Sequence, residues 1–153
     1  MRTKEQNSRH LANLNAALAA GMAGCKVHPC DPKTKKPFTK WKTEATSDIG
    51  KIKLFWEKFP NAMPAIVTGK ASGFTVVDLD IKNGKDGVAA YKDLGLDPDD
   101  AGTVVKTASG GLHLYFDCFD GVGNSVDKLA PGIDIRGDDG YVIAPGPIGE
   151  IGR

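Results

Sequence analysis

The sequence predicts an α+β protein in which a helical N-terminal part precedes a mostly antiparallel sheet. The prediction rests on a change in the spacing of apolar residues along the chain. Apolar residues recur every three or four positions in residues 4–22 and 49–59, as in helices, and every second position from Pro64 onward, as in strands. Only residues 86–94 interrupt the strands with a helical pattern, and few helices among many strands favour antiparallel pairing over a doubly wound parallel sheet.

The N-terminal part, residues 1–62, is expected to form a helical and basic unit. Its first helix spans residues 4–22 and carries apolar side chains three or four positions apart, at Leu11, Leu14, Leu18 and Met22. A short strand over residues 26–30 and an exposed loop rich in lysine and turn formers, residues 31–37, should follow. The second helix is expected to begin after the cap Asp48 and to end before Pro60.

The second part, residues 63–146, is expected to form the sheet of the same single domain, since 153 residues are enough to bury one core. Its predicted strands are residues 65–68, 74–81, 103–106, 112–116, 133–135 and 141–144.

Charge is divided unevenly along the chain. Residues 1–70 hold 13 Lys/Arg and 5 Asp/Glu, whereas residues 71–153 hold 7 and 14. This predicts a basic lobe suited to a polyanion and an acidic lobe suited to cations. The chain has no apolar run long enough to span a membrane and no signal peptide at its start, so we expect a cytoplasmic protein with no membrane partner.

The three cysteines are expected to be free thiols. The spacing of Cys25, His28 and Cys30 resembles a zinc motif. In an extended strand, however, Cys25 and His28 would face opposite ways, and we expect no zinc.

The segment Thr75-Val76-Val77-Asp78-Leu79-Asp80 is an apolar run that ends in two carboxylates. In a strand Asp78 and Asp80 point to one face and Val77 and Leu79 to the other, so both carboxylates can reach one divalent ion or a close pair of ions. The alternative is an ordinary turn after the strand, since Asn83-Gly84 follows.

Two later strands repeat this division of faces. His113 and Tyr115 share one face of residues 112–116, and Asp134 and Arg136 share one face of residues 133–136. In one sheet these strands would form a polar face suited to phosphoryl transfer with metal help, with His113 and Arg136 as phosphate ligands. Ser109-Gly110-Gly111, just before His113, is either an anion-binding turn or a plain hairpin turn.

The order of these motifs resembles the bifunctional DNA primase/polymerase N-terminal (prim-pol) domain of the archaeo-eukaryotic primase superfamily, which is common on plasmids, phages and integrated elements. The matching segments are Asp78-Leu79-Asp80, residues 109–116 and residues 131–145, and the similarity extends over residues 20–146. Residues 146–153 depart from the usual continuation, so we expect a shortened C-terminal end.

The resemblance implies a primase fold, with an RRM-like catalytic sheet and a small N-terminal α/β unit. It also implies DNA primase/polymerase activity in replication, with Asp78, Asp80 and Asp134 as catalytic ligands of two Mg²⁺ or Mn²⁺ ions. His113 would contact the triphosphate of a dNTP or NTP, with Ser109, Gly110 and Arg136 assisting. The partners would be a single-stranded DNA template and a replicative helicase in trans. The basic residues that would track template phosphates are Lys33, Lys35, Lys36, Lys40 and Lys42.

Two other functions stay open at the level of the sequence. The first is a non-catalytic module that binds nucleotides or single-stranded DNA, which the expected short C-terminal end supports. A metal-dependent nuclease would use the same carboxylates and histidine for phosphodiester hydrolysis.

Overall fold

The computed structural model describes residues 1–107, 109–118 and 121–144. Residues 146–153, on which the expectation of a shortened C-terminal end rests, lie outside this part of the chain. The elements are α1 (Lys4–Met22), β1 (Val27–Cys30), α2 (Trp41–Glu44), α3 (Ile49–Lys58), β2 (Met63–Val67), β3 (Phe74–Leu79), β4 (Ile81–Lys82), β5 (Lys85–Asp86), α4 (Gly87–Asp93), the short 3-10 helix η1 (Pro98–Asp100), β6 (Thr103–Lys106), β7 (Leu112–Asp117), β8 (Ser125–Val126), β9 (Ile133–Arg136) and β10 (Tyr141–Ile143).

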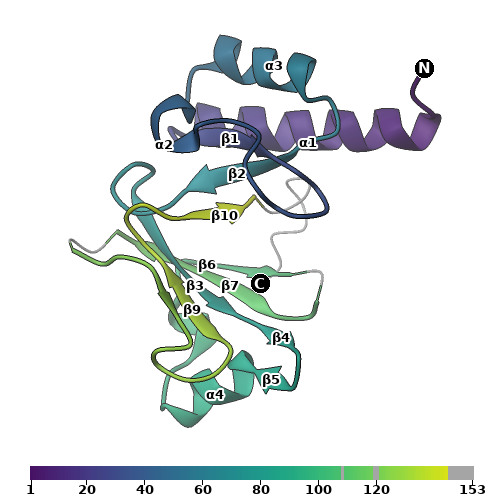
Figure 1. Cartoon of the computed structure of the whole chain (residues 1–153). Helices are drawn as coiled ribbons and strands as arrows, with labels where there is room; N and C mark the ends of the chain where they lie inside the picture. The colour runs from purple at the N-terminus through teal and green to yellow at the C-terminus, as the bar shows by residue number, and fades with distance from the viewer. Residues whose placement is uncertain (108, 119–120, 145–153) are drawn as a thin grey trace. The chain divides into compact units, whose positions relative to one another are not determined.

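The chain forms two compact units, each with its own sheet (Figure 1). Unit 1 consists of Met1–Val67 and the segment that begins at Tyr141, because β10 pairs with β2. Unit 2 consists mainly of Thr68–Gly140. All the strand pairs in both units are antiparallel, which confirms the α+β prediction for the residues described.

In unit 1, α1 and α3 pack together and against a three-stranded sheet of order β1-β2-β10 (Figure 1). Helix α1 begins at a capping box formed by Thr3 and Gln6, and α3 begins at Asp48, whose side chain accepts a hydrogen bond from the Lys51 backbone N–H. The core cluster is formed by Ala17, Val27, Ile52, Trp56 and Ala62.

The face that α1 buries differs from the predicted one. The bounds of the helix match the prediction, but Leu11 and Met22 are 55% and 79% exposed. The fully buried residues of α1 are small and include Ala17 and Gly21. Leu14 and Leu18 of the predicted stripe do pack against the core cluster. A Cβ on Gly21 would lie 2.4 Å from the Ile52 side chain, so the close approach of α3 adds small residues to the buried face of α1.

In unit 2, a five-stranded sheet has the order β6-β7-β3-β9-β8, and α4 packs against β3 and β9. The core cluster on this side of the sheet is built around Leu79, Tyr91, Leu114 and Ile133. These strand residues alternate with the polar residues of the opposite face, where the candidate site lies.

The predicted strand over residues 74–81 is interrupted at Asp80. Strand β3 ends at Leu79, and the chain continues into a hairpin of β4 and β5. The hairpin turn is Asn83-Gly84, with φ of 54° and 76°, the two positive angles that a type I′ turn requires.

All three cysteines are free, as expected. None of the helices described has the length and apolar character needed to cross a bilayer.

Candidate metal centre

Three neighbouring strands of unit 2 place polar side chains in one row across the sheet. In the pairing register, Asp78 of β3 lies directly opposite His113 of β7 on one side and Asp134 of β9 on the other. Residues directly opposite in an antiparallel pair point to the same face. His113 Nε2 lies 3.3 Å from Asp78 Oδ1, so the row forms one cluster of side chains.

Asp80 joins this row although it lies beyond the end of β3. Its backbone N–H donates to the carbonyl of Gly132, and its carbonyl accepts from the N–H of Gly87, both at 2.8 Å. A Cβ on Gly87 would lie 2.2 Å from the Gly132 oxygen, so only glycine allows this approach. The bond to Gly132 continues the register of β3 and β9 by one residue, which keeps the Asp80 side chain on the same face as Asp78.

The carboxylates of Asp78, Asp80 and Asp134 offer ligand atoms that all lie within 4.8 Å of one another. Within the described ranges, no other group of three or more His, Cys, Asp or Glu side chains meets that spacing. Carboxylate oxygens are the ligands that Mg²⁺ and related hard cations prefer.

Two further observations fit a cation between these carboxylates. Asp78 Oδ1 is buried and has no aligned hydrogen-bond donor among the described residues. Burial raises the pKa of the Asp80 carboxyl, and so do the charges of Asp78 and Asp134, against the opposing effects of Lys82 and His113. A divalent ion would relieve both the unpaired oxygen and the repulsion.

Asp134, the most buried of the three at 7% exposure, is held from two sides. Its Oδ1 accepts a hydrogen bond of 3.1 Å from the backbone N–H of Asp127. Its Oδ2 lies 3.5 Å from Nη2 of Arg136, which is on the same face of β9. The guanidinium thus lies at the edge of the acidic cluster.

The glycine-containing segment before His113 is a tight turn between β6 and β7. The backbone of Thr107 bonds to Gly111 and Gly110 at 3.0 Å, and the hydroxyls of Thr107 and Ser109 lie 3.3 Å apart. Ser109 and Gly110 are exposed, and a Cβ on Gly111 would lie 2.2 Å from the Leu79 carbonyl oxygen. The turn therefore approaches the end of β3, next to the acidic cluster.

The predicted DNA-binding lysines lie in unit 1 and not in the unit that carries the acidic cluster. All five are exposed, on the loop after β1 and on the segment that begins α2, at Lys33, Lys35, Lys36, Lys40 and Lys42. Lys42 Nζ lies 5.6 Å above the ring of Trp41.

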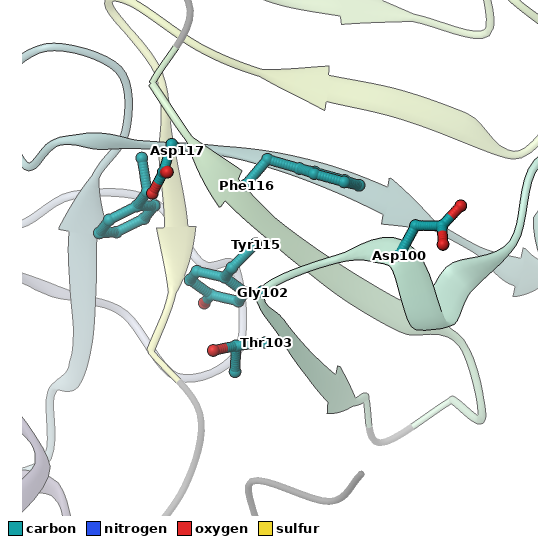
Figure 2. Close-up of a pocket in the computed structure, with 7 residues that line it drawn as sticks. Asp100, Gly102, Thr103, Tyr115, Phe116 and Asp117 are labelled. Atoms are coloured by element: carbon teal, nitrogen blue, oxygen red, sulfur yellow. The ribbon is translucent and has the colours of Figure 1, made fainter.

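A hollow of about 620 Å³ lies further along β7, at the β6 edge of the sheet. Figure 2 shows Tyr115 beside Thr103, and Phe116 extending toward Asp100. Tyr115 shares the face of His113 and packs on Phe74 with ring centroids 5.1 Å apart.

Three charged residues near the acidic cluster were not predicted from the sequence. Lys82 Nζ lies 3.9 Å from Asp80 Oδ1, and Lys85 pairs with Asp127, whose backbone contacts Asp134. The positions of the two lysines could have been predicted from the Asn83-Gly84 turn, because a two-residue hairpin turn brings the residues on either side of it back beside the end of the strand. Asp127 has no comparable signal in the sequence.

A family model described as the bifunctional DNA primase/polymerase N-terminal domain matches residues 16–153. No curated protein matches the chain.

Proposed function

Because this chain belongs to the family of bifunctional DNA primase/polymerase N-terminal domains, we propose that it catalyses template-directed nucleotidyl transfer. The resemblance seen in the sequence is thereby confirmed, and so is the α+β fold class. The observation that carries the proposal is the row of His113, Asp78 and Asp134 with Asp80 beside it, three carboxylates and an imidazole on one sheet face.

The family is metal-dependent, and the acidic cluster fits that requirement. Asp78, Asp80 and Asp134 would hold two Mg²⁺ or Mn²⁺ ions, which neutralise phosphate charge and favour the ionised form of the attacking hydroxyl. The 3′-oxygen of the growing strand attacks the α-phosphorus, the bond to the β-phosphate oxygen breaks, and pyrophosphate leaves.

The other polar residues of this face would orient the triphosphate. His113 lies beside Asp78 and offers a ring N–H, and Arg136 offers a planar fork of donors at the opposite side of the row. Ser109, in the exposed turn before β7, would add a hydroxyl, and Gly110, whose N–H donates to the Thr107 carbonyl, would hold that turn. Orientation by several donors is the main contribution a protein makes to phosphoryl transfer.

The template would be single-stranded DNA, bound in part by the five exposed lysines of unit 1. Such binding weakens with salt because it releases counterions from the phosphates. We place the activity in the replication of a plasmid, phage or integrated element, with a helicase acting in trans.

The test is synthesis from labelled nucleotides on single-stranded DNA, with and without a primer, in Mg²⁺ or Mn²⁺. We expect incorporation by the wild type and by Asp139→Asn, and none by Asp78→Asn. Asp139→Asn is the matched control because it removes the charge of an exposed aspartate in the same unit. Salt-sensitive DNA binding without synthesis would instead support a binding module, and oligonucleotide degradation without extension would support a nuclease.

A further inference from the structure

We propose that Asp127, held by Lys85, is a positioning residue that fixes two of the three metal-binding carboxylates, Asp134 and Asp80. The inference rests on the proposed metal-binding role of those carboxylates. It assigns a role to a charged pair that lies outside every motif of the sequence.

The first link runs from Asp127 to Asp134. Strand β8 ends at Val126, which pairs with Asp134, and Asp127 follows it with a left-handed backbone, φ +53°. In this conformation the Asp127 N–H points at Asp134 Oδ1, at 3.1 Å, and is shared with the Ile133 carbonyl at 3.1 Å. One oxygen of Asp134 is thus fixed by a backbone donor, and this contact orients the whole carboxylate.

The second link runs from Asp127 to Asp80 through Gly132. The Asp127 side chain accepts a hydrogen bond of 2.8 Å from the Gly132 N–H, which closes the loop between β8 and β9. The carbonyl of the same Gly132 accepts the Asp80 N–H, also at 2.8 Å. A shift of Asp127 would therefore move the backbone that sets Asp80.

The third link is Lys85, which lies on β5 directly after the Asn83-Gly84 turn. Its ammonium pairs with Asp127 Oδ2, the oxygen that Gly132 does not use. The two oxygens of Asp127 are therefore held by different segments, and the side chain has little freedom to rotate away. Both of these contacts of the Asp127 carboxylate are with residues that surround the acidic cluster.

Lys85 and its hairpin neighbour Lys82 provide a test that separates loss of positive charge from release of Asp127, because the two effects change the Mn²⁺ affinity in opposite directions. Both lysines place a positive charge near the cluster, and removing a positive charge alone should strengthen cation binding. Among the residues that the structure describes, Lys82 forms its ion pair with Asp80, at 3.9 Å, so Lys82→Met should bind Mn²⁺ about two- to fivefold more tightly. Lys85→Met should instead bind Mn²⁺ about two- to fivefold more weakly, because it releases Asp127.

Asp127→Asn is the second variant, with Asp139→Asn as its control, because both aspartates have left-handed backbones, φ 53° and 60°, which asparagine tolerates. We expect about tenfold weaker Mn²⁺ binding for Asp127→Asn, and wild-type binding for Asp139→Asn. Free Mn²⁺ measured by electron paramagnetic resonance gives the affinities. Hydrogen exchange of the Asp80 and Gly132 amides in EDTA gives a readout without metal.

The proposal predicts faster exchange of both amides in Lys85→Met and Asp127→Asn than in Lys82→Met and Asp139→Asn. Tighter Mn²⁺ binding by Lys85→Met, equal to that of Lys82→Met, would overturn it, and so would unchanged amide exchange in Asp127→Asn. A wild type that binds no Mn²⁺ would overturn the proposed function. The amide exchange would then still decide whether Asp127 holds this backbone.

Discussion

Replacing Asp80 with asparagine should stabilise the metal-free protein and at the same time remove most of its stabilisation by Mn²⁺. The side chain is only 21% exposed and offers a ligand atom within 4.8 Å of those of Asp78 and Asp134. Asparagine keeps the shape of the side chain and removes its charge. The variant therefore tests whether the three carboxylates repel one another when no cation lies between them.

The size of the effect follows from the distances. Charges 4.8 Å apart repel by about 3.5 kcal/mol at an effective dielectric constant of about 20, and by about 0.9 kcal/mol in bulk water. The Asp80→Asn replacement removes two such repulsions and one attraction, to Lys82 at 3.9 Å. That attraction is about 4.3 kcal/mol at a dielectric constant of about 20 and about 1.1 kcal/mol in bulk water. The net expectation is a gain of about 1–3 kcal/mol for metal-free Asp80→Asn.

The pH dependence has a defined sign. Because the pKa of Asp80 is raised in the folded state above its ordinary 3.8, the unfolded chain releases this proton first as the pH rises. The contribution of Asp80 to the stability of the metal-free wild type is therefore lost as the pH rises from 3.8 through the raised pKa of the folded state, and Asp80→Asn lacks this contribution.

Urea unfolding at pH 8 measures the gain in stability of the metal-free variant when EDTA is present, and the stabilisation by the metal when Mn²⁺ is present. At a Mn²⁺ concentration about 100 times the dissociation constant, the wild type should gain about 2.7 kcal/mol, and Asp80→Asn much less. Asp139→Asn, with an exposed carboxylate, should behave as the wild type in both conditions. An Asp80→Asn protein less stable than the wild type in EDTA would refute the reasoning.

Three further predictions concern the backbone, the N-terminal unit and the lysines. Gly132→Ala and Gly95→Ala both place alanine at positive φ, 87° and 79°, but only at Gly132 would the Cβ meet neighbouring backbone, at 2.8 Å. Only Gly132→Ala should therefore weaken Mn²⁺ binding, whereas Gly95→Ala should lower the free energy of unfolding by about 1–2 kcal/mol through backbone strain alone. Burial lowers the pKa of His28 from 6.5 to about 4, so this residue should make the wild type lose stability as the pH falls from 6.5 toward 4. Between pH 6.5 and 4.5, the free energy of unfolding in urea should fall by about 2–3 kcal/mol less in His28→Phe than in the wild type. An equal fall in both proteins would show that His28 is not the cause. Replacing Lys33 and Lys36 with glutamine should lower the slope of log affinity against log salt for single-stranded DNA by about 1.4, measured by fluorescence anisotropy, whereas an unchanged slope would remove both lysines from the interface.

The row of polar residues across the sheet could be predicted because successive side chains of a strand point to opposite faces, which depends on local geometry alone. Asp78, His113 and Asp134 each sit at a position whose neighbours are apolar, so each strand carries its own evidence of which side is polar. The pairing of β7, β3 and β9 then brings the three side chains together. The bounds of α1 were also accessible, because apolar residues recur at helical spacing as far as Met22.

Features that depend on contacts between distant segments could not be predicted. Asp80 is held by a hydrogen bond to Gly132, some fifty residues later in the chain, and the local sequence does not indicate that partner. Asp127 reaches Asp134 only because its backbone is left-handed. The close packing of Gly21 against Ile52 of α3 is likewise a contact between distant segments, and the hydrophobic stripe of α1 does not indicate it.

We propose that Asp78, Asp80 and Asp134 together bind the divalent ions for nucleotidyl transfer. The most direct measurement is a Mn²⁺ titration followed by electron paramagnetic resonance, with and without a nonhydrolysable dNTP analogue. The account predicts that the wild type binds about two Mn²⁺ ions when the nucleotide is present, and that Asp78→Asn and Asp134→Asn lose this binding. Wild-type Mn²⁺ binding in both variants would contradict it.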